Sequence, residues 1–110
     1  MRKRDPHVPL TPAVFYILLA LSGKERHGYD IMRQVQNDSV GVVTMGPGTL
    51  YGSLDRMMDA GLVERASHAS SDARRIYYKL TAKGAQALQA EIERMSTIAK
   101  IASKRRLRSA

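Results

Sequence analysis

Cysteine and tryptophan are both missing from this sequence of 110 residues, and phenylalanine occurs once. Without cysteine the chain can form no disulfide framework, no thiolate metal site and no cysteine nucleophile. Long hydrophobic runs are missing too, because the longest, residues 13–21, is far shorter than the about 20 residues that span a bilayer. We therefore expect a cytoplasmic protein without a membrane partner.

The basic residues 2–4 precede that apolar run, an order that also occurs in signal peptides. Pro6, Pro9 and Pro12 interrupt the approach, however, and Thr11-Pro12 is typical of a helix start. We therefore expect residues 1–10 to be a flexible arm rather than a leader.

Acidic residues are also few, with 10 Asp and Glu against 18 Lys and Arg, which gives a formal charge of +8. The excess is uneven: residues 1–60 hold 7 basic and 6 acidic side chains, whereas residues 61–110 hold 11 and 4. A basic half indicates a polyanionic partner, either nucleic acid or an anionic membrane surface, although an ordinary solvated surface has the same composition. The small size of the chain favours dimerisation, which would bury more of its surface.

Catalytic and metal-binding patterns are not recognisable. His7, His27 and His68 are far apart and lack the spacing of metal ligands. The glycines between residues 46 and 52 miss the dinucleotide-binding fingerprint and follow a loop instead of a strand. We expect no enzyme activity, no cofactor and no metal.

Apolar periodicity and capping residues predict four helices and a β-hairpin. The predicted helices are residues 12–21, about 27–38, about 48–60 and 82 to about 106; the predicted strands are 62–65 and 75–80, around a polar tip at 67–72. The fold class is therefore mainly α with a small β-hairpin (α+β). Three helices followed by a wing form the winged helix-turn-helix arrangement, in which the third helix enters the major groove of DNA.

The last predicted helix has an apolar seam with alternating spacings of three and four, typical of a coiled coil. At about 1.5 Å per residue it would be longer than a domain of this size can cover. We predict that a second copy covers it, through a dimer interface made by Leu88, Ile92, Met95, Ile98, Ala99 and Ala102. The chain would then divide into an arm (1–10), a DNA-binding domain (11–80) and a dimerisation helix with a basic tail (81–110).

Several short motifs resemble the PadR-like transcriptional regulators, over about residues 8–95. The matching motifs are Leu10-Thr11-Pro12, His27-Gly28-Tyr29-Asp30-Ile31, Gly48-Thr49-Leu50-Tyr51, Gly61-Leu62-Val63, and the run from Arg75 to Gly84. The resemblance implies a dimeric repressor of inverted-repeat operators, relieved in many members by a small hydrophobic or aromatic effector. The single C-terminal helix resembles the short subgroup, but the chain lacks the tryptophan that some short members use to stack flat ligands.

The candidate DNA-binding residues lie mainly on the third helix and the wing. They are Gly48, Thr49, Tyr51, Ser53 and Arg56, off the Leu50, Leu54 and Met57 core face, with Arg74 and Arg75 in the wing and Tyr29 at the start of the second helix. Hydroxyl and guanidinium groups can contact base edges or phosphates, and Arg prefers guanine. An ordinary amphipathic helix, a solvated hairpin and an inward-packed tyrosine would give the same patterns.

Two other functions stay open on the sequence. The chain is alternatively a winged-helix module that binds proteins, or a nucleic-acid binder driven by charge alone. Both would keep the same core, but neither would depend on the identity of Thr49 or Tyr51.

Overall fold

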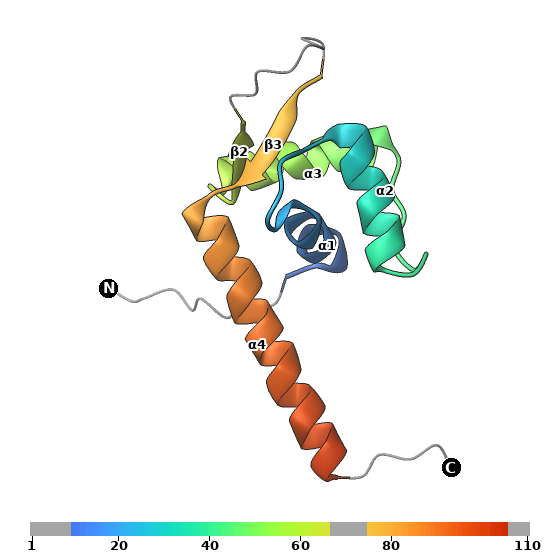
Figure 1. Ribbon diagram of the computed structural model, residues 1–110, viewed down its shortest axis with the longest axis vertical. Coiled ribbons are helices and arrows are strands. Elements are labelled where there is room, and N and C mark those ends of the chain that lie inside the picture. The colour runs from blue at the N-terminus through green and yellow to red at the C-terminus, as the bar shows by residue number, and fades with distance from the viewer. Residues whose placement is uncertain (1–9, 67–74, 106–110) are drawn as a thin grey trace.

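The computed structural model describes residues 10–66 and 75–105, and within them it has four helices and three strands. These elements are α1 (Pro12–Leu21), β1 (Arg26–His27), α2 (Gly28–Asp38), α3 (Pro47–Asp59), β2 (Val63–Arg65), β3 (Tyr77–Leu80) and α4 (Ala82–Lys104). The first three helices and the sheet pack together, whereas α4 extends well beyond them (Figure 1). In the described part of the chain, no helix combines the length and hydrophobicity needed to cross a bilayer.

The helix boundaries follow from local capping groups. The Thr11 hydroxyl accepts a hydrogen bond from the Val14 amide at 3.2 Å, and the Thr81 hydroxyl accepts one from the Gly84 amide at 2.9 Å. Gly61 has a φ of 79°, the left-handed conformation that ends a helix without steric cost. The predicted helix start at Thr11-Pro12 is confirmed.

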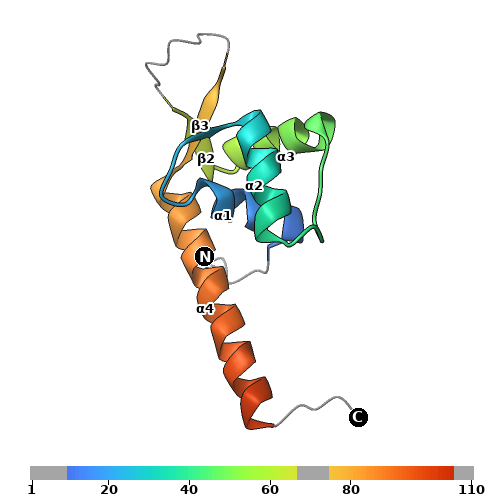
Figure 2. The same ribbon diagram turned by 45° about the vertical axis from the view of Figure 1, so that its right-hand side comes forward.

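The core forms around α1, which contacts α2, α3, α4 and β3 (Figure 2). The largest fully buried side chains come from the first three helices: Ile17, Leu18, Ile31, Val35, Leu50 and Leu54. Full burial of such a side chain stabilises the fold by about 2 kcal/mol. α1 is thus buried on most of its sides, and the core fixes how α2 and α3 cross.

The sheet has three antiparallel strands in the order β1-β3-β2, one strand more than the predicted hairpin. The missed strand, β1, is two residues long and pairs with Tyr77 and Tyr78 of β3. It has no apolar alternation of its own, so only its partner reveals it. The predicted second strand, 75–80, was also too long, because β3 begins at Tyr77; Ile76 precedes it and is exposed.

A hydrogen-bonded joint connects the end of α3 to the start of α4. Thr81 donates its amide to the Leu62 carbonyl at 3.1 Å and its hydroxyl to the Gly61 carbonyl at 2.6 Å. A Cβ on Gly84 would overlap the Leu62 carbonyl, so only glycine allows the helix to come this close. The direction of α4 is therefore tied to that of α3.

Candidate nucleic-acid interface

The outward face of α3 is the side opposite the core. Leu50, Ser53, Leu54 and Met57 are buried. With 3.6 residues per turn, the line opposite them runs through Gly48, Gly52, Asp55 and Asp59. A Cβ added at Gly48 would meet nothing within 4 Å, and one at Gly52 would meet only a guanidinium nitrogen of Arg56 at 3.6 Å, so the backbone is bare at the helix start. A large partner could therefore approach the helix start closely.

The flanks of this bare line carry the polar side chains predicted for the third helix. Thr49 and Arg56 lie exposed on one flank, and Tyr51 lies on the other. Ser53 does not belong to this set, because its side chain faces the core and the residue is only 3% exposed. The prediction that Ser53 contacts DNA is therefore wrong; its hydroxyl instead lies 3.4 Å from a guanidinium nitrogen of Arg56.

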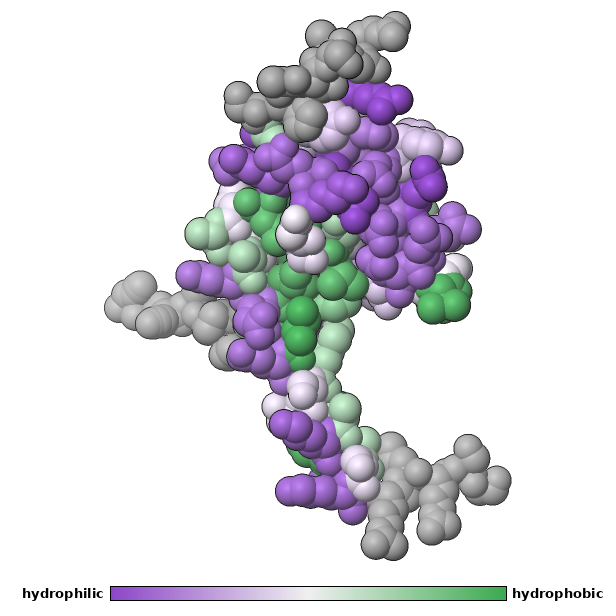
Figure 3. Space-filling model, viewed as in Figure 1, coloured by the Kyte–Doolittle hydropathy of each residue, from purple (hydrophilic) through white to green (hydrophobic). Residues whose placement is uncertain are grey.

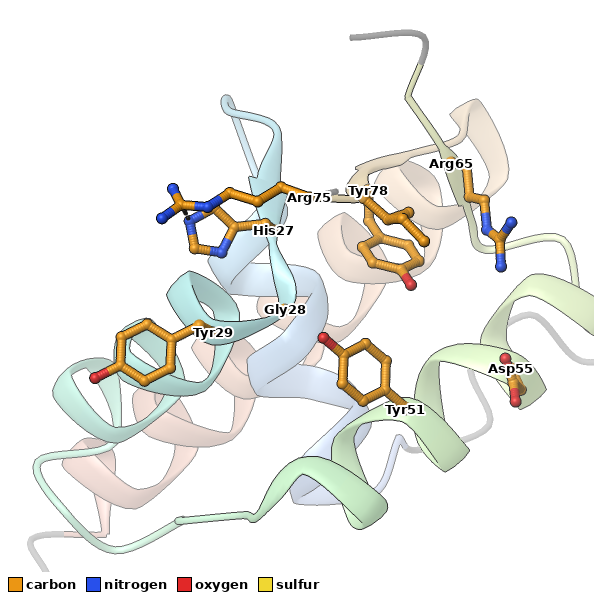
Figure 4. Close-up of a pocket in the computed structure, with 9 residues that line it drawn as sticks. His27, Gly28, Tyr29, Tyr51, Asp55, Arg65, Arg75 and Tyr78 are labelled. Atoms are coloured by element: carbon orange, nitrogen blue, oxygen red, sulfur yellow. Dashed lines mark hydrogen bonds between the residues drawn. The ribbon is translucent and has the colours of Figure 1, made fainter. Parts of the chain in front are cut away.

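A cleft of about 470 Å³ lies beside the Tyr51 flank, between α2, α3 and the sheet (Figure 4). Its lining residues are His27, Gly28, Tyr29, Tyr51, Asp55, Arg65, Arg75, Ile76 and Tyr78. It brings together three of the predicted site residues, Tyr29, Tyr51 and Arg75. Its walls are aromatic, and cationic groups stand at two of its edges.

Two motifs that are far apart in the sequence meet in this cleft. A Cβ on Gly28, at the start of α2, would overlap the hydroxyl of Tyr51 on α3 and lie 2.7 Å from its Cζ. Glycine at position 28 therefore makes room for the end of the Tyr51 ring, which points toward α2 (Figure 4). Two of the motifs that carry the family resemblance are therefore in direct contact.

His27 holds the upper edge of the cleft. Its Nδ1 accepts a hydrogen bond from the Asp30 amide at 3.3 Å, so it caps α2. Its ring meets the edge of Tyr77, with centroids 5.4 Å apart, and its Nε2 lies 3.4 Å from the Arg75 guanidinium. These contacts place Arg75 across the entrance to the cleft, whereas Arg74 lies outside the described residues.

Tyr78 and Arg65 form the opposite wall. Burial raises the pKa of the Tyr78 hydroxyl, and Arg65, which is hydrogen-bonded to it, opposes part of that rise. The phenol therefore keeps its proton at neutral pH and can donate a hydrogen bond. Arg65 and Asp55 were not among the predicted site residues, although the position of Asp55 opposite the core of α3 could have suggested it.

Tyr29 stands at the outer edge of the cleft and is 63% exposed. The guanidinium of Arg33, one turn further along α2, lies 6.0 Å from the centre of its ring. The alternative that Tyr29 packs inside the fold is therefore wrong. Its hydroxyl is available to a partner beside the outward face of α3.

The predicted dimer residues divide into two groups. Leu88 is only 5% exposed and packs in the core of its own chain, so the prediction that it contacts a second copy is wrong. The exposure of Ile92, Met95 and Ile98 lies between 38% and 49%, and Ala99 is exposed as well. Apolar surface is visible where α4 leaves the rest of the fold, whereas hydrophilic residues cover much of the upper part (Figure 3).

Three helices, a short antiparallel sheet and the β2–β3 wing define a winged helix-turn-helix protein. The profile described as "Transcriptional regulator PadR-like family" matches residues 17–90. The chain therefore belongs to the PadR-like family, whose members are transcriptional regulators and not enzymes. It has no significant match among curated protein sequences.

Solved structures agree with this assignment. RosR of H. salinarum is 31% identical, with a TM-score of 0.66 over 83% of this chain and 76% of that one. A PadR family transcription regulator from Clostridium difficile R20291 is 24% identical, with a TM-score of 0.70 over 86% and 97% of the two chains. Bacillus subtilis PadR in complex with operator DNA has 23% identity and a TM-score of 0.63, over 74% of this chain and 46% of that protein. Because their sequence identities are below 25%, the last two similarities show a shared fold only.

Proposed function

We propose that this protein is a homodimeric transcriptional repressor that binds an inverted-repeat operator in double-stranded DNA in the cytoplasm. Residues 11–80 would bind the DNA, and residues 81–110 would form the dimer. The observation that carries the proposal is the outward face of α3, where bare glycine backbone is flanked by exposed polar side chains. A protein-interaction module would have no need of this surface beside a cationic cleft.

On this proposal, α3 enters the major groove with its first turns leading. Gly48 and Gly52 let the backbone approach the DNA, and the amides at the helix start favour phosphate oxygens. Thr49 and Arg56 then reach base edges, and Arg56 pairs best with guanine. Specificity thus rests on a few side chains of α3, while the net charge of +8 supplies affinity and steering.

Phosphate contacts come from the cleft and the wing. Arg75 crosses the cleft entrance, and the hydroxyls of Tyr29 and Tyr51 lie on its walls. Arg74, beyond the described residues, would extend this contact along the wing. Such contacts hold the protein in register on the backbone, and each adds about one unit to the slope of log affinity against log salt.

The dimer would form along the distal part of α4. Met95, Ile98, Ala99 and Ala102 continue the same helix face that Leu88 buries within its own chain. A two-fold axis through paired α4 helices would present two copies of α3 to half-sites one helical turn, or a multiple of it, apart. Ile92 lies at the point where the covered part of the helix ends.

Relief of repression would change the angle between the two α3 helices of the dimer. Because hydrogen bonds from Thr81 and Lys83 join α4 to the end of α3, a shift of the paired α4 helices would move α3 with them. A small hydrophobic or aromatic effector bound near the dimer interface could drive such a shift. The absence of tryptophan means that any stacking would have to use other side chains.

Selection of bound duplexes from a random library tests the proposal without a known operator. We expect an inverted repeat that binds about 1,000-fold more tightly than random duplex at the same salt concentration. Selected DNA that binds no better than random duplex would point to charge-driven binding. Absence of DNA binding altogether would favour a protein partner.

Substitutions on α3 test which surface makes the contact. Arg56→Ala and Tyr51→Ala should each weaken binding to the selected site by about 1–3 kcal/mol. Lys100→Ala, on the distal part of α4, removes one positive charge far from the reading face and serves as the control. All three variants should stay dimeric by light scattering, and unchanged affinity in both α3 variants would remove α3 from this role.

A further inference from the structure

The side chains of α3 carry a net negative charge, whereas the protein as a whole is positively charged. The helix carries one arginine and two aspartates, although the chain has a formal charge of +8. Asp55 and Asp59 lie on the line opposite the core, where the proposed function places DNA. A carboxylate there is repelled by phosphates, so it weakens binding unless it accepts hydrogen bonds from the bases.

Of the two aspartates, only Asp55 lines the cleft. It lines the cleft one turn after Tyr51, and Arg65 approaches from β2 on the other side (Figure 4). Among the described residues, no ion pair or hydrogen bond engages the Asp55 carboxylate. Asp59, one turn further on, is exposed and lies outside the cleft. Asp55 is therefore exposed toward the partner with its acceptor oxygens available.

We propose that Asp55 is a specificity-determining residue that accepts a hydrogen bond from the amino group of a cytosine in the major groove. This inference rests on the proposed function and adds one base contact to it. A carboxylate can only accept hydrogen bonds, and cytosine presents the N4 amino group at its major-groove edge. Guanine and thymine present acceptor oxygens there, and the amino group of adenine lies beside the acceptor N7.

The same carboxylate disfavours the wrong bases. Facing guanine or thymine, Asp55 would have an unpaired negative charge opposite acceptor atoms, which costs more than the mere loss of a contact. Specificity is gained in this way when a repulsive group penalises competitors. Arg65, on the opposite wall of the cleft, offsets part of the repulsion between Asp55 and the DNA backbone.

Parallel selections from a random duplex library test the proposal with the full chain. The wild type should select a motif with cytosine at one position of each half-site. Asp55→Ala should lower the preference at that position about tenfold, leave the other positions unchanged and bind random duplex more tightly. Asp55→Asn, which keeps the side-chain shape, should shift the preference toward adenine, the base that Asn contacts through N6 and N7.

Asp59→Ala is the matched control, because it removes the same charge from the same line one turn away. It should bind random duplex more tightly without changing the preference at any position. A cytosine preference that survives both Asp55 substitutions overturns the proposal, and Asp55→Asn decides alone if Asp55→Ala fails to fold. A wild type that selects no motif would instead reject the proposed function itself.

Discussion

The two halves of α4 have the same apolar pattern but opposite surroundings. In the first half, Gly84, Leu88 and Glu91 are buried against the rest of the chain. In the second half, the large apolar side chains Ile92, Met95 and Ile98 are all between 38% and 49% exposed. One continuous helix face therefore serves two purposes: the first half completes the core of its own chain, and the second half offers apolar surface to a partner.

The difference arises from length and from one close contact. Gly84 brings the start of α4 against the Leu62 carbonyl, and α1 covers the next turns. Beyond Glu91 the helix extends past α1–α3 and the sheet, and no other described helix or strand covers it (Figure 1). Three large apolar side chains exposed along this side of the helix form a patch of the kind that marks an interaction site.

Leu88→Ala should give the largest effect, because it removes a buried side chain from the covered half. We expect the free energy of unfolding to fall by about 3 kcal/mol at every protein concentration, as for other Leu→Ala changes in cores. Urea unfolding curves recorded at two protein concentrations measure this change in the free energy of unfolding. Met95→Ala, from the exposed half, is the control and should shift the midpoint only where the dimer dominates. Equal effects from both variants would mean that the halves do not differ.

Ile92→Glu should separate the two halves. A charge in the uncovered apolar seam should weaken the dimer about 100-fold. The domain formed by α1–α3 and the sheet should stay folded, because its core does not depend on this side chain. Light scattering at micromolar concentration should then show monomer, and circular dichroism should show unchanged helix content apart from the distal turns. A dimer that persists at this concentration would reject the α4 interface.

The features that could be predicted from the sequence depend on neighbouring residues. The caps at Thr11, Thr81 and Gly61 are set by hydrogen bonds and backbone angles within one turn, so local patterns reveal them. The order of helices and the wing followed from periodicity in the same way. β1 was missed because its two residues form a strand only through pairing with β3, which lies about 50 residues away.

The site was harder to predict. Periodicity shows which residues share a helix face, but it does not show whether the chain's own core, a partner or solvent lies against that face. Ser53 is polar but lies on the buried side of α3, and Leu88 belongs to the chain's own core and not to a partner. The contact between Gly28 and Tyr51 and the place of Arg65 in the cleft depend on how α2, α3 and the sheet cross. These are tertiary contacts, which local sequence patterns do not reveal.

Glu91 lies at the boundary between the two halves and should give the smallest effect. Its carboxylate is buried and accepts hydrogen bonds from the Arg94 guanidinium at 2.7 Å and 3.1 Å and from the Leu10 amide at 3.4 Å. The bonds from Arg94, and then the one from Leu10, hold its pKa below the ordinary value of 4.5 although burial opposes them. The pair is exposed on its Arg94 side, so screening by solvent keeps its contribution to stability small.

The sign of the pH dependence follows from this lowered pKa. Because the folded state binds the proton less tightly than the unfolded chain, the stabilisation is present above pH 4.5 and disappears as the pH falls through the folded value. Urea unfolding from about pH 6 to about pH 3 should therefore show wild type and Glu91→Gln converging as the pH falls. Glu93→Gln, an exposed residue of the same helix, controls for the loss of one charge. A gap between wild type and Glu91→Gln that is equal at every pH would mean that Glu91 joins the halves by packing alone.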